Sequence, residues 1–277
     1  MRAPRHALPL TETCDGLRVE AGHATPCADV IANETAVALV YNGKPHVVMM
    51  ATPQDLEDFV LGFSLSEGVI RTPEELQAVR IHDAPDGLVA EIDIDVARGH
   101  ALERARRNLT GRVGCGLCGA QTLAQAVRHP STVPSAVRMR GEFLQKALSV
   151  LPDRQPLYAA TGAVHAAAWV DGAGRLGLVR EDVGRHNALD KLIGALMREH
   201  GRIDPGAVLL TSRASHEMIQ KAATVGIEIV CAVSAPTALA IRLAEETGLT
   251  LAAFARGGRH TVYTHAYRLD GRAGAGA

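Results

Sequence analysis

Two cysteines stand close together in the segment GRVGCGLCG, where Cys115 and Cys118 are separated by two residues and surrounded by four glycines. So much glycine favours a mobile or tightly bent loop over a stiff element. A sulfur carrier needs such a loop, because its thiol accepts sulfur as a persulfide in one place and presents it in another. The attacking species is a thiolate. The cation of Arg112 and a helix start near Gly119 would both favour the anion.

Three other interpretations of the cysteine pair remain open on spacing alone. A structural zinc site needs four ligands, and one CxxC provides two, with His129 standing alone nearby. A thioredoxin-like dithiol would sit at a strand-to-helix junction, whereas the residues before Cys115 are predicted to be helical. Two buried cysteines without a chemical role are the third interpretation, and the flanking glycines argue against it. We expect no structural metal.

The segment EDVGRHNALDK (181–191) is a second cluster of polar residues. It closes a predicted strand and opens a predicted helix, with Asn187 as the expected N-cap and Asp190 as the acidic residue at the third position. The preceding turn gathers charge where sites usually lie in α/β sheets, in Glu181, Asp182, Arg185 and His186. An ion-paired turn that only positions the helix explains the pattern equally well.

Three further turns carry hydroxyl groups or arginines: TSRASHEM (211–218), SAPTALA (234–240) and ARGGRH (255–260). The first two precede predicted helices, whose N-termini attract anions. The third places two arginines around a flexible Gly-Gly pair. Together these turns would suit a phosphate-bearing ligand, although capped helices and solvated arginines are common.

The elements that position these motifs fall into two groups. Residues 1–30 show no periodicity and predict an irregular lead. AVALVY and HVVMMA flank Asn42-Gly43-Lys44-Pro45, which predicts a β-hairpin over 36–51. A helix is expected from Thr52, as its N-cap, to Gly68, and the remaining predictions for this part are a strand at 88–96 and a basic helix at 98–109.

After residue 130 the pattern changes to alternating helices and strands. Proline and serine in HPSTVPSA (129–136) indicate a boundary. The predicted order is helix 141–151, strands 163–170 and 175–182, helix 187–200, strand 207–212, helix 215–225, strand 227–233, helix 237–247 and strands 249–256 and 261–265. This alternation predicts a three-layer α/β sheet with parallel central strands. We therefore expect an irregular lead (1–30), a small α+β domain (31–128), an α/β domain (129–267) and a flexible tail (268–277).

Composition excludes several classes of protein. Hydrophobic residues make up 47% of the 277 residues, so the chain can bury a core and is not disordered. Only 3% of residues are aromatic and the net charge is −1, which argues against a nucleic-acid partner. We find no apolar run of membrane-spanning length. Five cysteines form an odd, sparse set, so we expect a reducing, cytoplasmic location rather than a disulfide framework.

The motifs GRVGCGLCG, TGAVHAA, EDVGRHNALDK, SRASHEM, SAPTALA and FARGGR, in this order, closely resemble the FdhD family, from about residue 30 to residue 267. Members of that family are accessory sulfurtransferases for formate dehydrogenase. The resemblance implies a small N-terminal α+β part and a cytidine-deaminase-like C-terminal part. A zinc deaminase itself needs H-x-E and P-C-x-x-C. His216-Glu217 lacks the spacer and CGLC lacks the proline, so deaminase activity is not expected.

The resemblance also implies a reaction and its residues. A cysteine desulfurase would pass sulfur to Cys115 as a persulfide, with Cys118 assisting. The chain would then pass the sulfur to a bis-molybdopterin guanine dinucleotide molybdenum cofactor, bound as a substrate, for formate dehydrogenase. The nucleotide of this cofactor would contact Phe254, Ala255, Arg256, Gly257, Gly258 and Arg259. A non-enzymatic cofactor chaperone and a dithiol oxidoreductase stay open as alternatives, and a homodimer is compatible with the family.

Overall fold

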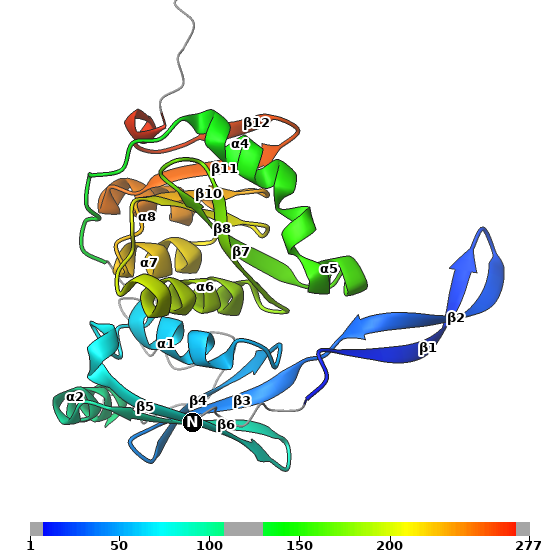
Figure 1. Cartoon of the computed structure of the whole chain (residues 1–277), viewed down its shortest axis with the longest axis horizontal. Helices are drawn as coiled ribbons and strands as arrows, with labels where there is room; N and C mark the ends of the chain where they lie inside the picture. The colour runs from blue at the N-terminus through cyan, green and yellow to red at the C-terminus, as the bar shows by residue number, and fades with distance from the viewer. Residues whose placement is uncertain (1–7, 108–129, 270–277) are drawn as a thin grey trace, which may run out of the picture.

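The structure is a computed structural model that describes residues 8–107 and 130–269, and it is a mixed α/β protein with three sheets (Figure 1). Cys115 and Cys118 lie outside the described residues. The sheets are a two-stranded ribbon, a four-stranded sheet and a six-stranded sheet. In Figure 1 the two larger sheets lie at opposite ends of the body, with helices between them.

The four-stranded sheet has the order β4-β3-β6-β5. Its strands are β3 (Thr35–Tyr41), β4 (Lys44–Ala51), β5 (Leu76–Ala84) and β6 (Gly87–Ile94). The hairpin predicted over 36–51 is confirmed: Asn42 and Gly43 both have positive φ, 48° and 74°, as a two-residue turn requires. The predicted strand at 88–96 is confirmed as β6, which runs parallel to β3.

Two helices and a short 3₁₀ turn complete this part: α1 (Leu56–Ser66), η1 (Pro73–Glu75) and α2 (Val96–Arg107). The prediction that Thr52 is the N-cap of the first helix is wrong, because the helix begins at Leu56 with Asp55 as its N-cap. Thr52 instead forms hydrogen bonds with a segment that is distant in the sequence. Its backbone N–H donates to Asp182 Oδ2 at 3.0 Å, and its hydroxyl accepts from the Val183 N–H at 3.1 Å.

The ribbon is formed by β1 (Thr11–Glu20) and β2 (His23–Ala32), which pair along their whole length. The prediction of an irregular lead over residues 1–30 is therefore wrong where these residues form β1 and β2. Both faces of the ribbon are largely exposed, so no alternation of apolar and polar residues marks it in the sequence. Figure 1 shows the ribbon projecting from the body of the molecule.

The six-stranded sheet has the order β12-β11-β10-β9-β7-β8. Its strands are β7 (His165–Asp171), β8 (Leu176–Asp182), β9 (Gly206–Leu210), β10 (Ile229–Ala232), β11 (Thr250–Arg256) and β12 (Arg259–Val262). The central strands β9, β10 and β11 are parallel, as predicted, and β7, β8 and β12 are antiparallel to their neighbours.

Helices cover both faces of this sheet. They are α4 (Gly141–Val150), η2 (Pro152–Arg154), α5 (Pro156–Thr161), α6 (Arg185–His200), α7 (His216–Thr224), α8 (Ala238–Thr247) and η3 (Ala266–Arg268). Along β7, Ala168 packs with Leu144 of α4, whereas Ala167 belongs to the core that contains α6. Alternate residues of one strand thus face opposite helix layers.

The two parts of the molecule meet where α1 packs on α6. One continuous hydrophobic cluster runs from Leu39 of the four-stranded sheet through Phe59 and Leu189 to Val208 of the six-stranded sheet. Whether the parts are separate domains with a boundary near residue 129 stays a prediction. In the described ranges, none of the helices is both long and apolar enough to cross a membrane.

Candidate functional site

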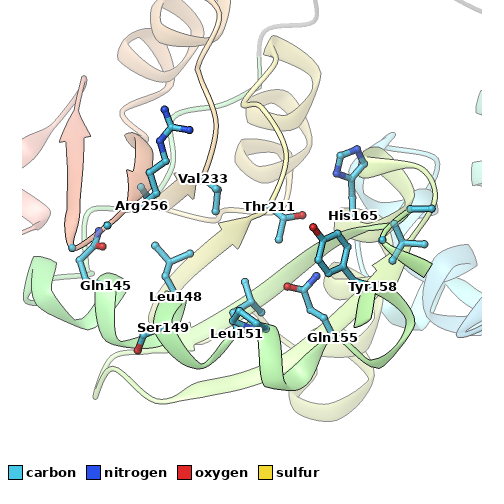
Figure 2. A pocket seen from close by; sticks show the side chains of 17 residues that line it. Gln145, Leu148, Ser149, Leu151, Gln155, Tyr158, His165, Thr211, Val233 and Arg256 are labelled. Carbon is cyan, nitrogen blue, oxygen red and sulfur yellow. The ribbon is translucent and has the colours of Figure 1, made fainter. Parts of the chain in front are cut away.

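A cavity of about 730 Å³ opens at the carboxyl ends of the parallel strands, on the face of the sheet that α4 covers. Small molecules bind at this edge in open α/β sheets. Figure 2 shows the side chains that line it. The lining comes from α4, α5 and the ends of four strands, and consists of Gln145, Leu148, Ser149, Leu151, Pro152, Gln155, Tyr158, Gly162, Ala163, Val164, His165, Thr211, Val233, Ala255, Arg256, Gly257 and Gly258.

The floor of the cavity is fixed by hydrogen bonds between strand ends. Thr211 follows β9, and its hydroxyl accepts from the Ala166 N–H at 2.8 Å. The Val233 N–H, which follows β10, donates to the Leu210 carbonyl at 2.8 Å. These bonds hold the strand ends against each other, so the floor of the cavity is formed without a ligand.

The segment Phe254–Arg259, expected from the resemblance to contact a nucleotide, forms the tip of the β11–β12 hairpin. Gly257 and Gly258 make the turn with φ of 60° and 77°, a conformation that favours glycine. Ala255, Arg256 and both glycines line the cavity, whereas Phe254 and Arg259 are not part of its lining. Phe254 also has a positive φ, 51°, and is 39% exposed. Its role and that of Arg259 stay predictions.

A second wall of the cavity comes from the short helix α5, which the sequence motifs did not indicate. The carboxylate of Glu181, at the end of β8, accepts the N–H of Leu157 at 2.9 Å and of Tyr158 at 2.8 Å. A strand residue thus satisfies the free N–H groups of the first turn of α5. This contact places Gln155 and Tyr158 in the cavity wall. The local signals for the element are Pro156, at the first helical position, and Gly162, which ends the helix in the left-handed conformation.

The segment EDVGRHNALDK is largely structural. Asp182 is buried and pairs with the equally buried Lys191 at 2.6 Å, and its Oδ1 accepts from the Gly184 N–H. The prediction that Asn187 is an N-cap is wrong, since α6 begins at Arg185 and the Asn187 amide donates to Met50 O at 2.7 Å. Contacts with the N-terminal part explain why these polar residues are buried here. A local capping rule does not take such contacts into account.

Asp190 is likewise not a first-turn acid of the helix. It is fully buried, and its carboxylate accepts from Ser66 Oγ at 2.6 Å and pairs with Lys221 at 2.9 Å. Burial raises the pKa of Asp190, and the charge of Lys221 opposes that shift. Asp190 therefore joins α1, α6 and α7 rather than serving a ligand.

On the opposite face of the sheet from α4, charged residues gather at the starts of α6 and α7. His186 Nε2 lies 2.7 Å from Glu217 Oε2, and this contact lowers the pKa of Glu217. Burial lowers the pKa of His165, and the charges of Arg185 and His186 lower it further. His165 is therefore neutral at pH 7.

Three cysteines lie in the described residues: Cys14, Cys27 and Cys231. Cys231 is buried in the sheet, and burial raises its pKa to about 12. A thiol with that pKa is protonated at neutral pH and is a poor nucleophile. Cys14 and Cys27 lie on the ribbon and are not part of the cavity lining. Across residues 8–107 and 130–269, we find no group of three or more His, Cys, Asp or Glu side chains placed to hold a metal ion.

The fold and the cavity define a mixed α/β protein with room for a small molecule at the carboxyl edge of its central sheet. A family model narrows this class: residues 32–270 match the FdhD/NarQ family, and the chain belongs to that family.

Curated relatives extend over nearly the whole chain. It is 51% identical over 253 residues to the sulfur carrier protein FdhD of Xanthomonas campestris pv. campestris, covering 91% of this chain and 90% of the relative. It is 51% identical over 242 residues to the sulfur carrier protein FdhD of Cupriavidus necator, covering 87% and 84%. A crystal structure assigned to a formate dehydrogenase accessory protein from Desulfotalea psychrophila is also similar. It has a TM-score of 0.72 and 26% identity, and the match covers 94% of this chain and all of that one.

Proposed function

We propose that this chain is a sulfurtransferase that carries sulfur on Cys115 and delivers it to a bis-molybdopterin guanine dinucleotide molybdenum cofactor for formate dehydrogenase. The observation that carries the proposal is the 51% identity to sulfur carrier proteins FdhD over 91% of the chain. The cavity lined by Ala255–Gly258 supports the cofactor part, because this segment is the one expected to contact the nucleotide.

The transfer is a thiol exchange in two steps. The Cys115 thiolate attacks the terminal sulfur of a persulfide on a cysteine desulfurase, and a new S–S bond forms as the old one breaks. The desulfurase cysteine leaves as a thiolate and takes up a proton, so no external oxidant or reductant is consumed in this first step. In the second step the Cys118 thiolate attacks the Cys115 sulfur of the persulfide, so that the S–S bond to the terminal sulfur breaks and hydrosulfide leaves toward the cofactor. The Cys115–Cys118 disulfide formed in this step is reduced by a cellular dithiol before the next cycle. The high pKa of Cys231 makes that thiol unsuited to the carrier role.

The cofactor is bound through its nucleotide. Arg256 supplies a cation beside two glycines whose backbone N–H groups a ligand can approach closely. Diphosphate oxygens match such a set of donors. The six-stranded sheet with its two helix layers is, on this proposal, a cytidine-deaminase-like scaffold that places the nucleotide at the strand ends.

Intact mass spectrometry tests the carrier step. After incubation with a cysteine desulfurase and cysteine, the protein gains the mass of one sulfur atom, and the gain disappears on reduction. Cys115→Ala removes the gain, whereas Cys14→Ser, a change on the exposed ribbon, retains it. A full gain in Cys115→Ala would overturn the assignment of the carrier.

Activity of formate dehydrogenase separates the alternatives. A strain that carries only Cys115→Ala contains inactive formate dehydrogenase if sulfur transfer is required. Normal activity together with unchanged cofactor binding in the Cys115/Cys118 double variant would identify a chaperone instead. An internal disulfide without any persulfide would identify a dithiol oxidoreductase.

The ribbon supports a homodimer as the working form. It carries exposed apolar side chains, namely Leu17, Val19, Val30 and Ile31, and two-stranded ribbons are marginally stable alone. Replacing these four residues with serine should convert a dimer into a monomer in sedimentation experiments. A wild-type monomer at micromolar concentration would contradict this part of the proposal.

A further inference from the structure

The side chain of Gln155 lines the cavity wall, and its amide has no hydrogen-bond partner among the described residues. Gln155 is only 5% exposed, and its side chain makes no hydrogen bond with residues of the described ranges. Its backbone is occupied, since the N–H donates to Pro152 O at 3.2 Å and the carbonyl accepts from the Ala159 N–H at 2.9 Å. Figure 2 shows the amide directed into the cavity beside Tyr158. The amide atoms are not among the fully enclosed atoms without a partner, so they are open to the cavity and free to hydrogen-bond with a ligand there.

Gln155 and Arg256 lie at opposite ends of the cavity. Arg256 ends β11, whereas Glu181 of β8 anchors the helix that follows Gln155. Strands β10, β9 and β7 separate β11 from β8 in the sheet. In Figure 2 the two side chains accordingly lie on opposite sides, with apolar side chains such as Leu148 and Leu151 between them.

The two ends offer different chemistry. Arg256 carries a positive charge beside the backbone of Gly257 and Gly258, which suits an anion. The Gln155 amide is neutral and presents one donor and one acceptor side by side. The edge of a purine base presents the complementary pair. On guanine the amide nitrogen donates to O6, and the amide oxygen accepts from N1–H. The apolar wall between the two ends suits a flat ring.

We propose that Gln155 recognises the base of the nucleotide, with its diphosphate directed toward Arg256–Gly258. This inference rests on the proposed function and adds the orientation of the ligand and the residue that selects the base. The reverse orientation would place the anionic phosphates beside a neutral amide and away from the cation of Arg256. It would also leave the charge of Arg256 on a neutral base.

Binding titrations of the full chain with GDP and with guanosine separate the two contacts. Gln155→Leu should weaken both ligands by about tenfold, because both contain the base and each lost hydrogen bond contributes modestly. Arg256→Ala should weaken GDP about tenfold and leave guanosine unchanged. Gln77→Leu is the matched control, since it removes an exposed amide on β5 that does not line the cavity. It should leave guanosine binding unchanged.

Each outcome is decisive. A wild-type chain that does not bind GDP overturns nucleotide binding and this inference together. GDP binding that Gln155→Leu leaves unchanged overturns the inference alone and preserves the proposed function. Weakened guanosine binding in Arg256→Ala would show the reverse orientation.

A second variant covers the case in which Gln155→Leu does not fold. The carboxylate of Gln155→Glu accepts both N1–H and the 2-amino group of guanine but faces the lone pair of adenine N1. The preference for GDP over ADP should therefore rise by about tenfold relative to the wild type. An unchanged preference would overturn the assignment of Gln155 to the base.

Discussion

The carboxylate of Glu181 accepts the backbone N–H of Leu157 at 2.9 Å, so the end of β8 holds the first turn of α5. The N–H of Tyr158 donates to the other oxygen at 2.8 Å. Glu181 is buried, and both bonds involve a charged acceptor, which makes them stronger than neutral ones. The wall of the cavity therefore depends on a residue that does not line it.

Replacing Glu181 with glutamine should loosen this wall. The amide offers one acceptor and turns a donor toward an N–H group, which costs about 1–3 kcal/mol of unfolding free energy. GDP affinity should fall as well, because α5 no longer holds its place. Urea unfolding and a GDP titration measure the two effects. Glu142→Gln is the control, since its ion pair with Arg140 is mostly exposed. Equal losses in the two variants would contradict the anchoring role.

The crossing of α1 and α6 should not tolerate a β carbon at Gly62 or Gly194. A β carbon on Gly62 would lie 1.7 Å from the Asp190 carbonyl oxygen, and one on Gly194 would lie 1.9 Å from that of Asp58. Gly62→Ala or Gly194→Ala must push the helices apart, at a cost of about 1–3 kcal/mol or more. Thermal unfolding measures this loss. Gly177→Ala, which meets only ordinary contacts, should change little, and an equally stable Gly62→Ala would contradict the close crossing.

Removing Lys221 should destabilise the protein more than most single changes. Its ammonium lies 2.9 Å from Asp190 Oδ2 and 2.7 Å from Glu67 Oε1 in a buried setting. Lys221→Met leaves the Asp190 carboxylate buried without its cation, which costs about 3–5 kcal/mol. Adding Asp190→Leu should recover much of that loss in urea unfolding. A loss no larger than that of the exposed control Lys146→Met would refute the coupling.

His165 should make stability depend on pH below about 6.5. Burial and the charges of Arg185 and His186 lower its pKa from the ordinary 6.5, whereas Asp182 acts in the opposite direction. As the pH falls through the unfolded value, the unfolded chain binds a proton that the folded chain resists, so stability falls. His165→Asn should therefore lose less stability than the wild type between about pH 7 and about pH 5.5. An identical decline in both proteins, in urea unfolding at the two values, would contradict this.

The sequence by itself determined most of the elements and their order. Helix and strand periods depend on neighbouring residues, so the alternation after residue 130 and the Asn42-Gly43 turn could be predicted. The motif order was enough to indicate the family, which the match over residues 32–270 confirms. The turn ARGGRH could also be selected as a candidate site from the sequence. A Gly-Gly pair favours a turn, and arginine carries a positive charge, in any fold.

Only the tertiary structure decided which polar residues are buried and what they contact. Asn187 and Asp190 have the residue types of helix caps, and local rules assign them that role. Packing of the N-terminal part on α6 instead buries both and gives them partners more than a hundred residues away, in Met50 of β4 and Ser66 of α1. The cavity combines segments from Gln145 to Gly258, so no local pattern marks Gln155. Burial and hydrogen bonding at these positions depend on which elements pack together. The spacing of residues along the sequence does not show which elements those are.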